Sequence, residues 1–153
     1  MLAEHVLSLA TWLPIFGGIA VLFTGSDRNA DYARQLSLVV AVLTFLVTLP
    51  LYTGFNSGTH AMQFVEDYAW IEAFNIRYRL GIDGISLLLI LLNSLTTVLV
   101  VAAAWQVIER RVAHYMAAFL VMSGMMNGVF ASLDAVLFYV FFEATLIPMY
   151  IVI

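Results

Sequence analysis

The residue best suited to chemistry is Glu143, the only charged side chain in the apolar segment 135–153. If a membrane helix begins near Ala135, a rise of about 1.5 Å per residue puts Glu143 roughly 12 Å into a hydrocarbon layer about 30 Å thick. A charged side chain at that depth costs about 2.5–3.5 kcal/mol on insertion scales, so such residues often serve transport or are paired. The position favours ion or proton handling. The alternative is a structural pair with a basic residue elsewhere.

The residues around Glu143 add polar groups to the same part of the helix. Tyr139 lies four residues before it and Tyr150 seven after it, so both share its helical face. Pro148 cannot donate a backbone hydrogen bond to the carbonyl of Ala144, and its ring crowds that carbonyl. A carboxylate, two phenols and a free carbonyl at a predicted kink can hold water. For the tyrosines themselves, packing or an interfacial aromatic belt is the favoured interpretation.

The composition identifies the class of protein that carries this segment. Hydrophobic residues make up 63% of the chain and charged residues 10%, with a mean hydropathy of +1.00. These values predict an all-α, polytopic membrane helix bundle. A net charge of -4 offers no basic surface for nucleic acid. Without cysteine, this chain has no disulfides, iron–sulfur ligands or thiol chemistry.

The apolar runs divide the chain into predicted membrane crossings joined by short loops. Each run is close to the length that one crossing requires. The long connection 53–84 is too polar for lipid and is expected to be an external loop. About five transmembrane helices are predicted, at residues 6–23, 36–52, 85–105, 115–133 and 135–153.

The arginines predict the orientation of these helices. Four of them lie in the loops after the first and third predicted helices, at Arg28, Arg34, Arg110 and Arg111. Only Arg77 and Arg79 lie on the opposite side. Because positive residues collect on the cytoplasmic side, the loops after the first and third helices are expected there, the N-terminus outside, and the fifth helix running inward.

The external connection contains a predicted strand. Residues 75–82 alternate polar and apolar side chains with period two, as a half-buried strand of a short hairpin does. Phe64, Trp70, Phe74 and Tyr78 suit a cover over the headgroup region. Asp83 is interpreted as the N-cap of the third helix, with a role in proton exit as the alternative.

Polar residues inside the third and fourth predicted helices suggest contacts between helices. Asn93 and Thr97 share a face and are expected to pack against a neighbouring helix, although they could also line a wet path. Gly124 and Gly128 have the small-xxx-small spacing that permits close backbone approach. Asn127, between them, is expected to make an interhelical hydrogen bond.

The sequence has no pattern typical of a metal or phosphate site. His5, His60 and His114 lie on different loops and helix ends without ligand spacing. Met122, Met125 and Met126 are interpreted as adaptable packing. No Gly-rich phosphate loop, nucleophile elbow or paired-carboxylate motif occurs.

Two motifs resemble one protein family. The segment Phe141-Phe-Glu-Ala-Thr-Leu-Ile-Pro-Met-Tyr150 resembles the fifth-helix signature of the M-type antiporter-like subunit of proton-pumping NADH:quinone oxidoreductase, respiratory complex I. Leu80-Gly-Ile-Asp-Gly-Ile-Ser-Leu87 is similar to the segment that opens the third helix of that family. The second motif is shared with related subunits and, more loosely, with multisubunit sodium/proton antiporters.

The resemblance implies a fold, a site and partners. It implies the N-terminal part of an antiporter-like inverted-repeat fold, consistent with a chain whose last apolar segment lacks a polar flank. Glu143 would be the proton-translocating carboxylate of the family, coupled to a lysine on a later helix. The chain contains no lysine. No cofactor or metal is expected in this chain, while NADH, FMN, iron–sulfur clusters and quinone would belong to partner subunits.

The resemblance also implies a location and leaves rival functions. The expected partners are other membrane-arm subunits and the lipid bilayer. The expected location is the bacterial inner (plasma) membrane, with the mitochondrial inner membrane as the equivalent. A subunit of a multisubunit sodium/proton antiporter is the alternative function, and a purely structural helix bundle is the third hypothesis.

Overall fold

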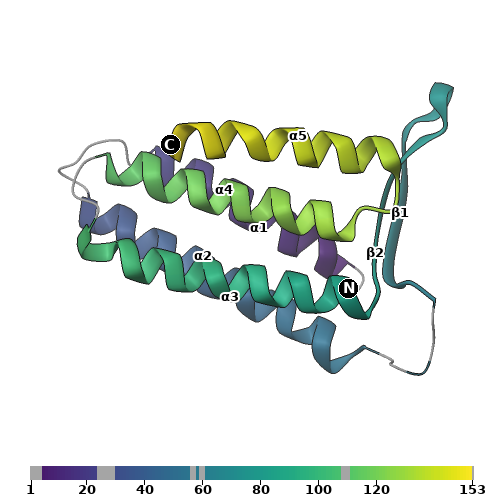
Figure 1. The fold of residues 1–153 in the computed structure, drawn as a ribbon, viewed down its shortest axis with the longest axis horizontal. Coiled ribbons are helices and arrows are strands. Elements are labelled where there is room, and N and C mark those ends of the chain that lie inside the picture. Colours follow the sequence, from purple (N-terminus) through teal and green to yellow (C-terminus); the bar gives the residue numbers. More distant parts are fainter. Residues whose placement is uncertain (1–4, 24–29, 56–57, 59–60, 108–110, 153) are drawn as a thin grey trace.

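The described residues form five α-helices and one two-stranded hairpin (Figure 1). The computed structural model describes residues 5–23, 30–55, 58, 61–107 and 111–152. In chain order the elements are α1 (Val6–Leu22), α2 (Ala30–Thr53), β1 (Gln63–Ile71), a 3-10 turn (Glu72–Phe74), β2 (Ile76–Ile82), α3 (Gly84–Val107), α4 (Val112–Ala131) and α5 (Ala135–Val152).

The predicted helices are all present, with different ends. The second helix begins at Ala30, six residues before its predicted start at 36, because the polar segment before the apolar run is also helical. Asp31 lies in its first turn, where a negative charge is favourable, and pairs with Arg34 at 3.0 Å. Arg28 and Arg110 of the predicted orientation lie outside the described residues, as does residue 153.

Four of the helices, α2 to α5, are long and apolar enough to cross a membrane. The remaining helix, α1, is apolar but has only 17 residues. Its predicted crossing therefore stays a prediction, although this length lies at the lower end of the range of about 17–25 residues seen for membrane helices.

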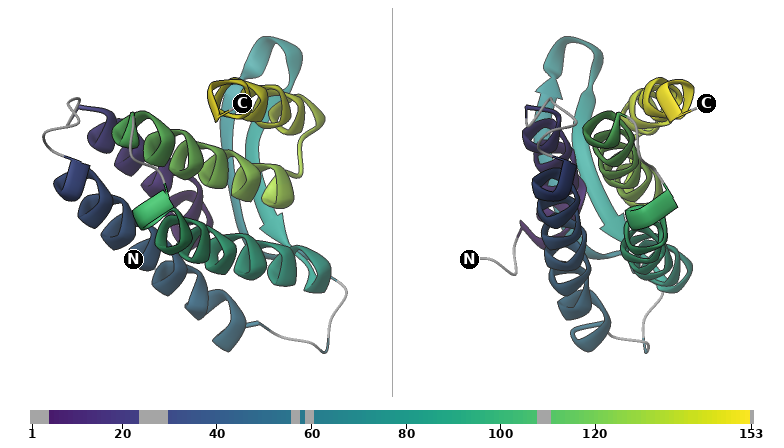
Figure 2. Two further views of the ribbon diagram at one scale, coloured as in Figure 1. Left: turned by 60° about the vertical axis from the view of Figure 1, so that its left-hand side comes forward. Right: turned by 90° about the vertical axis from the view of Figure 1, so that its left-hand side faces the viewer.

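Helix α4 occupies the centre of the bundle and packs against all four other helices (Figures 1 and 2). Its contact with α1 depends on small residues. A Cβ atom at Gly18 would lie 2.9 Å from the carbonyl oxygen of Ala117, so only glycine permits this approach. Close backbone packing of this kind is what holds helices together in lipid, where apolar burial gives little preference.

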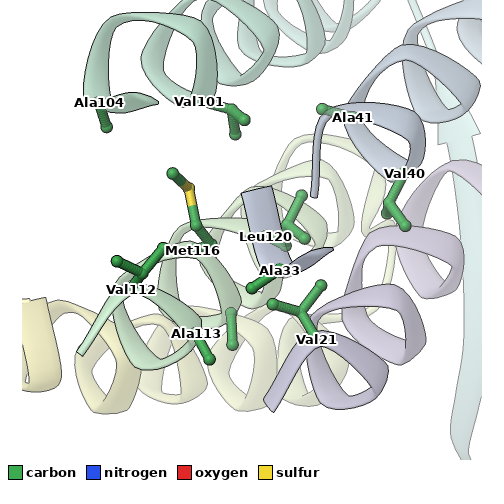
Figure 3. Close-up of a cluster of buried hydrophobic side chains, with 11 residues drawn as sticks. Val21, Ala33, Val40, Ala41, Val101, Ala104, Val112, Ala113, Met116 and Leu120 are labelled. Carbon is green, nitrogen blue, oxygen red and sulfur yellow. The ribbon is translucent and has the colours of Figure 1, made fainter. Parts of the chain in front are cut away.

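Two apolar clusters fill the bundle, one toward each end. The first surrounds Met116 and Leu120 of α4, with side chains from α1, α2 and α3 converging on them (Figure 3). The second lies beneath the hairpin and includes Leu80, Ile82 and Phe141. The hairpin is therefore a packed part of the bundle and not a free loop.

The hairpin confirms the strand predicted at residues 75–82. Strand β2 pairs antiparallel with β1, with Tyr68 opposite Tyr78 and Asp67 opposite Arg79. Asn75 closes the turn in the left-handed conformation, at φ 54°, which asparagine tolerates better than most residues. The hairpin crosses one end of the bundle and its tip projects past α5 (Figures 1 and 2).

Candidate functional site

Helix α5 carries the candidate carboxylate and has one buried stripe. Leu137, Phe141, Thr145 and Pro148 are buried, and the stripe packs mainly on α4. Phe141 also contacts the ring of Trp12, with centroids 6.1 Å apart. The rest of the helix surface is exposed and apolar, as expected for a surface that meets lipid or further protein.

Glu143 lies on this exposed surface. Tyr139 and Tyr150 are exposed with it, at 62% and 83% of their surface. In the part of the chain that the structure describes, Glu143 makes no hydrogen bond or ion pair. The proton-handling role requires that Glu143 be buried and lie near a cation. The described helices supply neither, so this role remains a prediction.

A buried polar cluster joins α1, α3 and α4. The amide nitrogen of Asn93 donates to the side-chain oxygen of Asn127 and to the carbonyl of Ser123, both at 2.9 Å. Thr97 donates to the hydroxyl of Ser123 at 2.8 Å. Asn127 in turn donates to the carbonyl of Ala10 at 2.9 Å. The predicted interhelical packing of Asn93, Thr97 and Asn127 is present.

Two aspartates cap helices at the hairpin end. Asp83 accepts from the amide of Ser86 at 2.9 Å, and this bond lowers the pKa of its carboxyl. Its predicted N-cap role is present. Asp134 accepts from the amides of Val136 at 2.9 Å and Arg77 at 3.2 Å. The amide of Arg77 is the main cause of the lowered pKa of Asp134.

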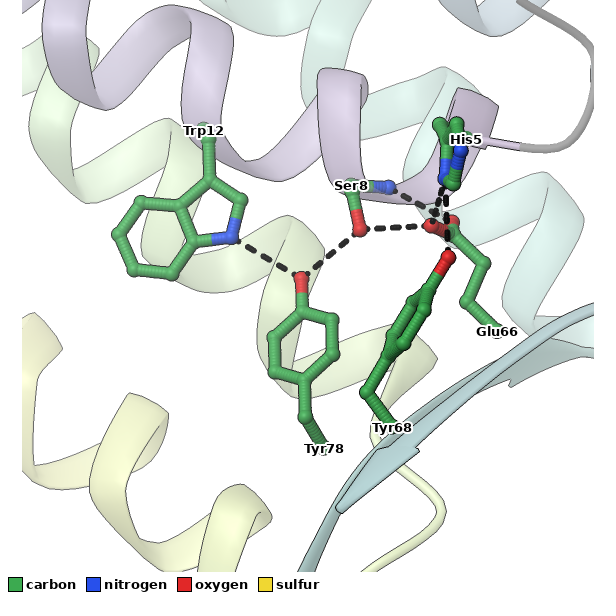
Figure 4. A network of polar contacts seen from close by, with 6 residues as sticks. All are labelled: His5, Ser8, Trp12, Glu66, Tyr68 and Tyr78. Carbon is green, nitrogen blue, oxygen red and sulfur yellow. Dashed lines mark hydrogen bonds and ion pairs between the residues drawn. The ribbon is translucent and has the colours of Figure 1, made fainter. Parts of the chain in front are cut away.

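A second polar cluster fastens the hairpin to α1 (Figure 4). The carboxylate of Glu66, with 1% of its side chain exposed, accepts from the hydroxyl of Ser8 at 2.7 Å and lies 3.4 Å from His5 Nδ1. Ser8 Oγ and Trp12 Nε1 each lie 3.0 Å from the Tyr78 hydroxyl, to which the indole donates. Burial raises the pKa of Tyr78, which keeps the phenol neutral as a hydrogen-bonding group.

Sequence reasoning missed Glu66 and its partner Ser8. A signal was present at the start of α1, which has neither a capping side chain nor an acidic residue in its first turn. Helix amides without local acceptors require one from elsewhere. The alternating strand that carries Glu66 did not reveal which residue supplies it.

Metal-binding groups do not gather in the described residues: no three His, Asp or Glu side chains there are arranged to hold an ion. The fold and its polar clusters define a multi-pass α-helical membrane protein with a carboxylate halfway along one apolar helix. No family model matches the chain.

Known proteins give a more specific result. The chain is 48% identical over 153 residues to NADH-quinone oxidoreductase subunit M of Rhodobacter capsulatus, covering 98% of this chain and 29% of that protein. It is 37% identical over 147 residues to NADH-ubiquinone oxidoreductase chain 4 of Chondrus crispus, covering 96% of this chain and 30% of that protein. The chain is therefore homologous to a part of NADH-quinone oxidoreductase subunit M, a membrane subunit of respiratory complex I.

A solved structure agrees with this assignment. Respiratory complex I from Thermus thermophilus with bound NADH contains a chain that matches with a TM-score of 0.75 and 30% identity. The match covers 97% of this chain and 27% of that one. The family and the helical membrane fold predicted from the motifs are thus confirmed. The chain spans about 30% of the length of these relatives.

Proposed function

We propose that this chain is part of the membrane arm of an NADH:quinone oxidoreductase and contributes to proton translocation through Glu143. Homology to subunit M over 98% of the chain carries the proposal. The partners would be other membrane-arm subunits in a bacterial plasma membrane or its mitochondrial equivalent. NADH, FMN, iron–sulfur clusters and quinone would be bound by partner subunits, where electron transfer takes place.

The position of Glu143 supports a transport role that is completed by protein outside the described residues. A carboxylate on an apolar helix surface is costly in lipid, so the surface around it calls for a protein neighbour. Next to Glu143, the carbonyl of Ala144 lacks its usual helical donor because Pro148 has no N–H. A carboxylate beside a free carbonyl favours a donor, either a basic side chain or a protonated water.

The proposed mechanism is electrostatic. Burial of a carboxylate favours its protonated form, while an approaching cation favours the ionised form. If electron transfer in the partner subunits moves a cation toward and away from Glu143, the carboxylate releases and takes up a proton in turn. This chain would then perform the translocation step and no redox chemistry.

The test compares variants of Glu143 with a control variant in the complete complex, reconstituted in vesicles. Glu143→Gln is expected to reduce NADH-driven proton pumping strongly while the complex assembles, because glutamine cannot exchange a proton. The matched control is Glu72→Gln in the exposed hairpin turn, which is expected to leave pumping unchanged. Normal pumping in both Glu143→Gln and Glu143→Ala would refute the proposal. Purification without flavin or iron–sulfur partners would favour the antiporter instead.

A further inference from the structure

The carboxylate of Glu66 acts as the N-terminal cap of α1, although it comes from strand β1. It accepts the amide hydrogen of Ser8, the third residue of the helix, at 2.9 Å, and the Ser8 hydroxyl at 2.7 Å. The two residues are 58 positions apart in the chain. A buried negative charge at a helix N-terminus meets unpaired amides and the positive end of the helix dipole.

Among the described residues, which begin at His5, Glu66 is the side chain that caps the start of α1. His5 occupies the N-cap position without a side-chain bond to the helix, and the first turn contains no acidic residue. Ser8 also bridges Glu66 to the Tyr78 hydroxyl on β2. Both strands of the hairpin are therefore fixed to one turn of α1 (Figure 4).

The other edge of the hairpin holds the turn between α4 and α5. The amide of Leu133 donates to the carbonyl of Arg79 at 2.9 Å, and the amide of Arg77 donates to Asp134 at 3.2 Å. Leu80 and Ser132 form an isolated bridge between the same segments. The hairpin thus connects the start of α1 with the start of α5 (Figure 1).

The contact of the hairpin with the α4–α5 turn bears on Glu143 because, within the described residues, α5 contacts few other elements. Apart from α4, the hairpin strand β2 is the main element that α5 contacts. Glu143 lies nine residues after Asp134 on this helix. The rotation and depth of its carboxylate consequently depend on how the α4–α5 turn is held.

We infer that Glu66 is a positioning residue for Glu143, acting through the hairpin and the α4–α5 turn. The inference rests on the proposed transport role of Glu143. The bonds of the Glu66 carboxylate in the described residues are to His5 and Ser8, not to Glu143. It holds the hairpin on α1, and the docked hairpin fixes the end of α5.

The first measurement does not depend on transport. Hydrogen exchange of peptides covering residues 132–142 is compared between the complete complex and its Glu66→Ala variant. Loss of the cap is expected to speed exchange there about tenfold, since local opening becomes easier. The matched control is Asp67→Asn, the next residue on β1, whose exposed carboxylate pairs with Arg77 at 2.6 Å. The control is expected to change exchange less than about twofold.

The second measurement is the number of protons pumped per NADH oxidised in vesicles. Glu66→Ala is expected to reduce this ratio at least about twofold, while NADH:quinone activity per assembled complex stays unchanged. Glu66→Gln keeps acceptors for Ser8 and is expected to restore much of the ratio. If Glu66 had a purely structural role, Glu66→Ala would lower proton pumping, NADH:quinone activity and the amount of assembled complex together.

The outcomes separate this inference from the proposed function. Faster exchange at 132–142 with an unchanged pumping ratio would overturn the positioning role and leave the transport role of Glu143 intact. Normal pumping in Glu143→Gln would overturn the transport role, whatever the exchange result. If Glu66→Ala fails to assemble, Ser8→Ala decides, because it removes the hydroxyl that bonds Glu66 and Tyr78, and wild-type exchange in Ser8→Ala would overturn the inference.

Discussion

Asn127 on α4 donates a hydrogen bond of 2.9 Å to the carbonyl of Ala10 on α1, the carbonyl that Pro14 leaves without a helical donor. The proline is inside α1, four residues after Ala10, and has no N–H to complete the helix ladder. A side chain from another helix supplies the missing bond. The side-chain amide of Asn127 also accepts a hydrogen bond from Asn93, so it links α1 and α4 to α3.

This relationship predicts a coupling between Asn127 and Pro14. Asn127→Ala is expected to lower stability by about 1–2 kcal/mol, since hydrogen bonds between membrane helices contribute on average about 0.6 kcal/mol each and two are lost. In a Pro14→Ala background the helix can supply its own donor to Ala10, so the cost of Asn127→Ala is expected to fall. A double-mutant cycle on thermal unfolding of the purified protein measures the difference. Equal costs in both backgrounds would contradict the assignment.

The contact between Gly124 and Thr11 predicts a steric effect. A Cβ at Gly124 would lie 2.5 Å from the carbonyl oxygen of Thr11, so Gly124→Ala is expected to push α1 and α4 apart. Overpacking of this kind typically costs about 1–3 kcal/mol. Gly84→Ala serves as the control because a Cβ atom there would have no neighbouring atom within 4 Å. The midpoint temperature of thermal unfolding should fall for Gly124→Ala and remain unchanged for Gly84→Ala.

The bonds of Asp134 predict a response to acid. The pKa of the Asp134 carboxyl is lowered from its ordinary value of 3.8, mainly by the Arg77 amide. The stabilisation that the ionised carboxylate gives to the turn is therefore complete above pH 3.8. It is lost as the pH falls through the lower native pKa. Exchange of the turn at 132–136 is therefore expected to speed up in that acidic window. Asp134→Asn should exchange faster already at neutral pH and show a smaller acid response at this site.

Removal of the Tyr78 hydroxyl is predicted to destabilise the hairpin. Tyr78→Phe is expected to destabilise the hairpin by about 1 kcal/mol, since Trp12 loses its acceptor and Ser8 loses a partner. Tyr68→Phe is the control, because its hydroxyl makes one exposed contact with His5 at 3.3 Å. Protection of the β1 and β2 amides from exchange gives the comparison. A larger loss in the Tyr68 variant would contradict the arrangement in Figure 4.

Local features of this fold were predictable where a short segment determines them. The helices follow from apolar runs of membrane length, and β2 follows from the alternation between residues 75 and 82. The Asp83 cap was predictable because the carboxylate and the amide that it binds are three residues apart. The start of α2 at Ala30 was not, because polar residues extend a helix beyond the lipid without changing the apolar pattern.

The sequence by itself determined the class of protein, the order of its helices and strands, and the single carboxylate within α5. Only the tertiary structure decided that Glu66 caps α1, that Asn127 completes the ladder of α1, and that Glu143 faces away from α4. The reason is physical. Almost every residue of α5 is apolar, so its pattern marks no inner face, and helix rotation is decided by packing. Partners separated by 58 or 117 residues meet only once that packing is set.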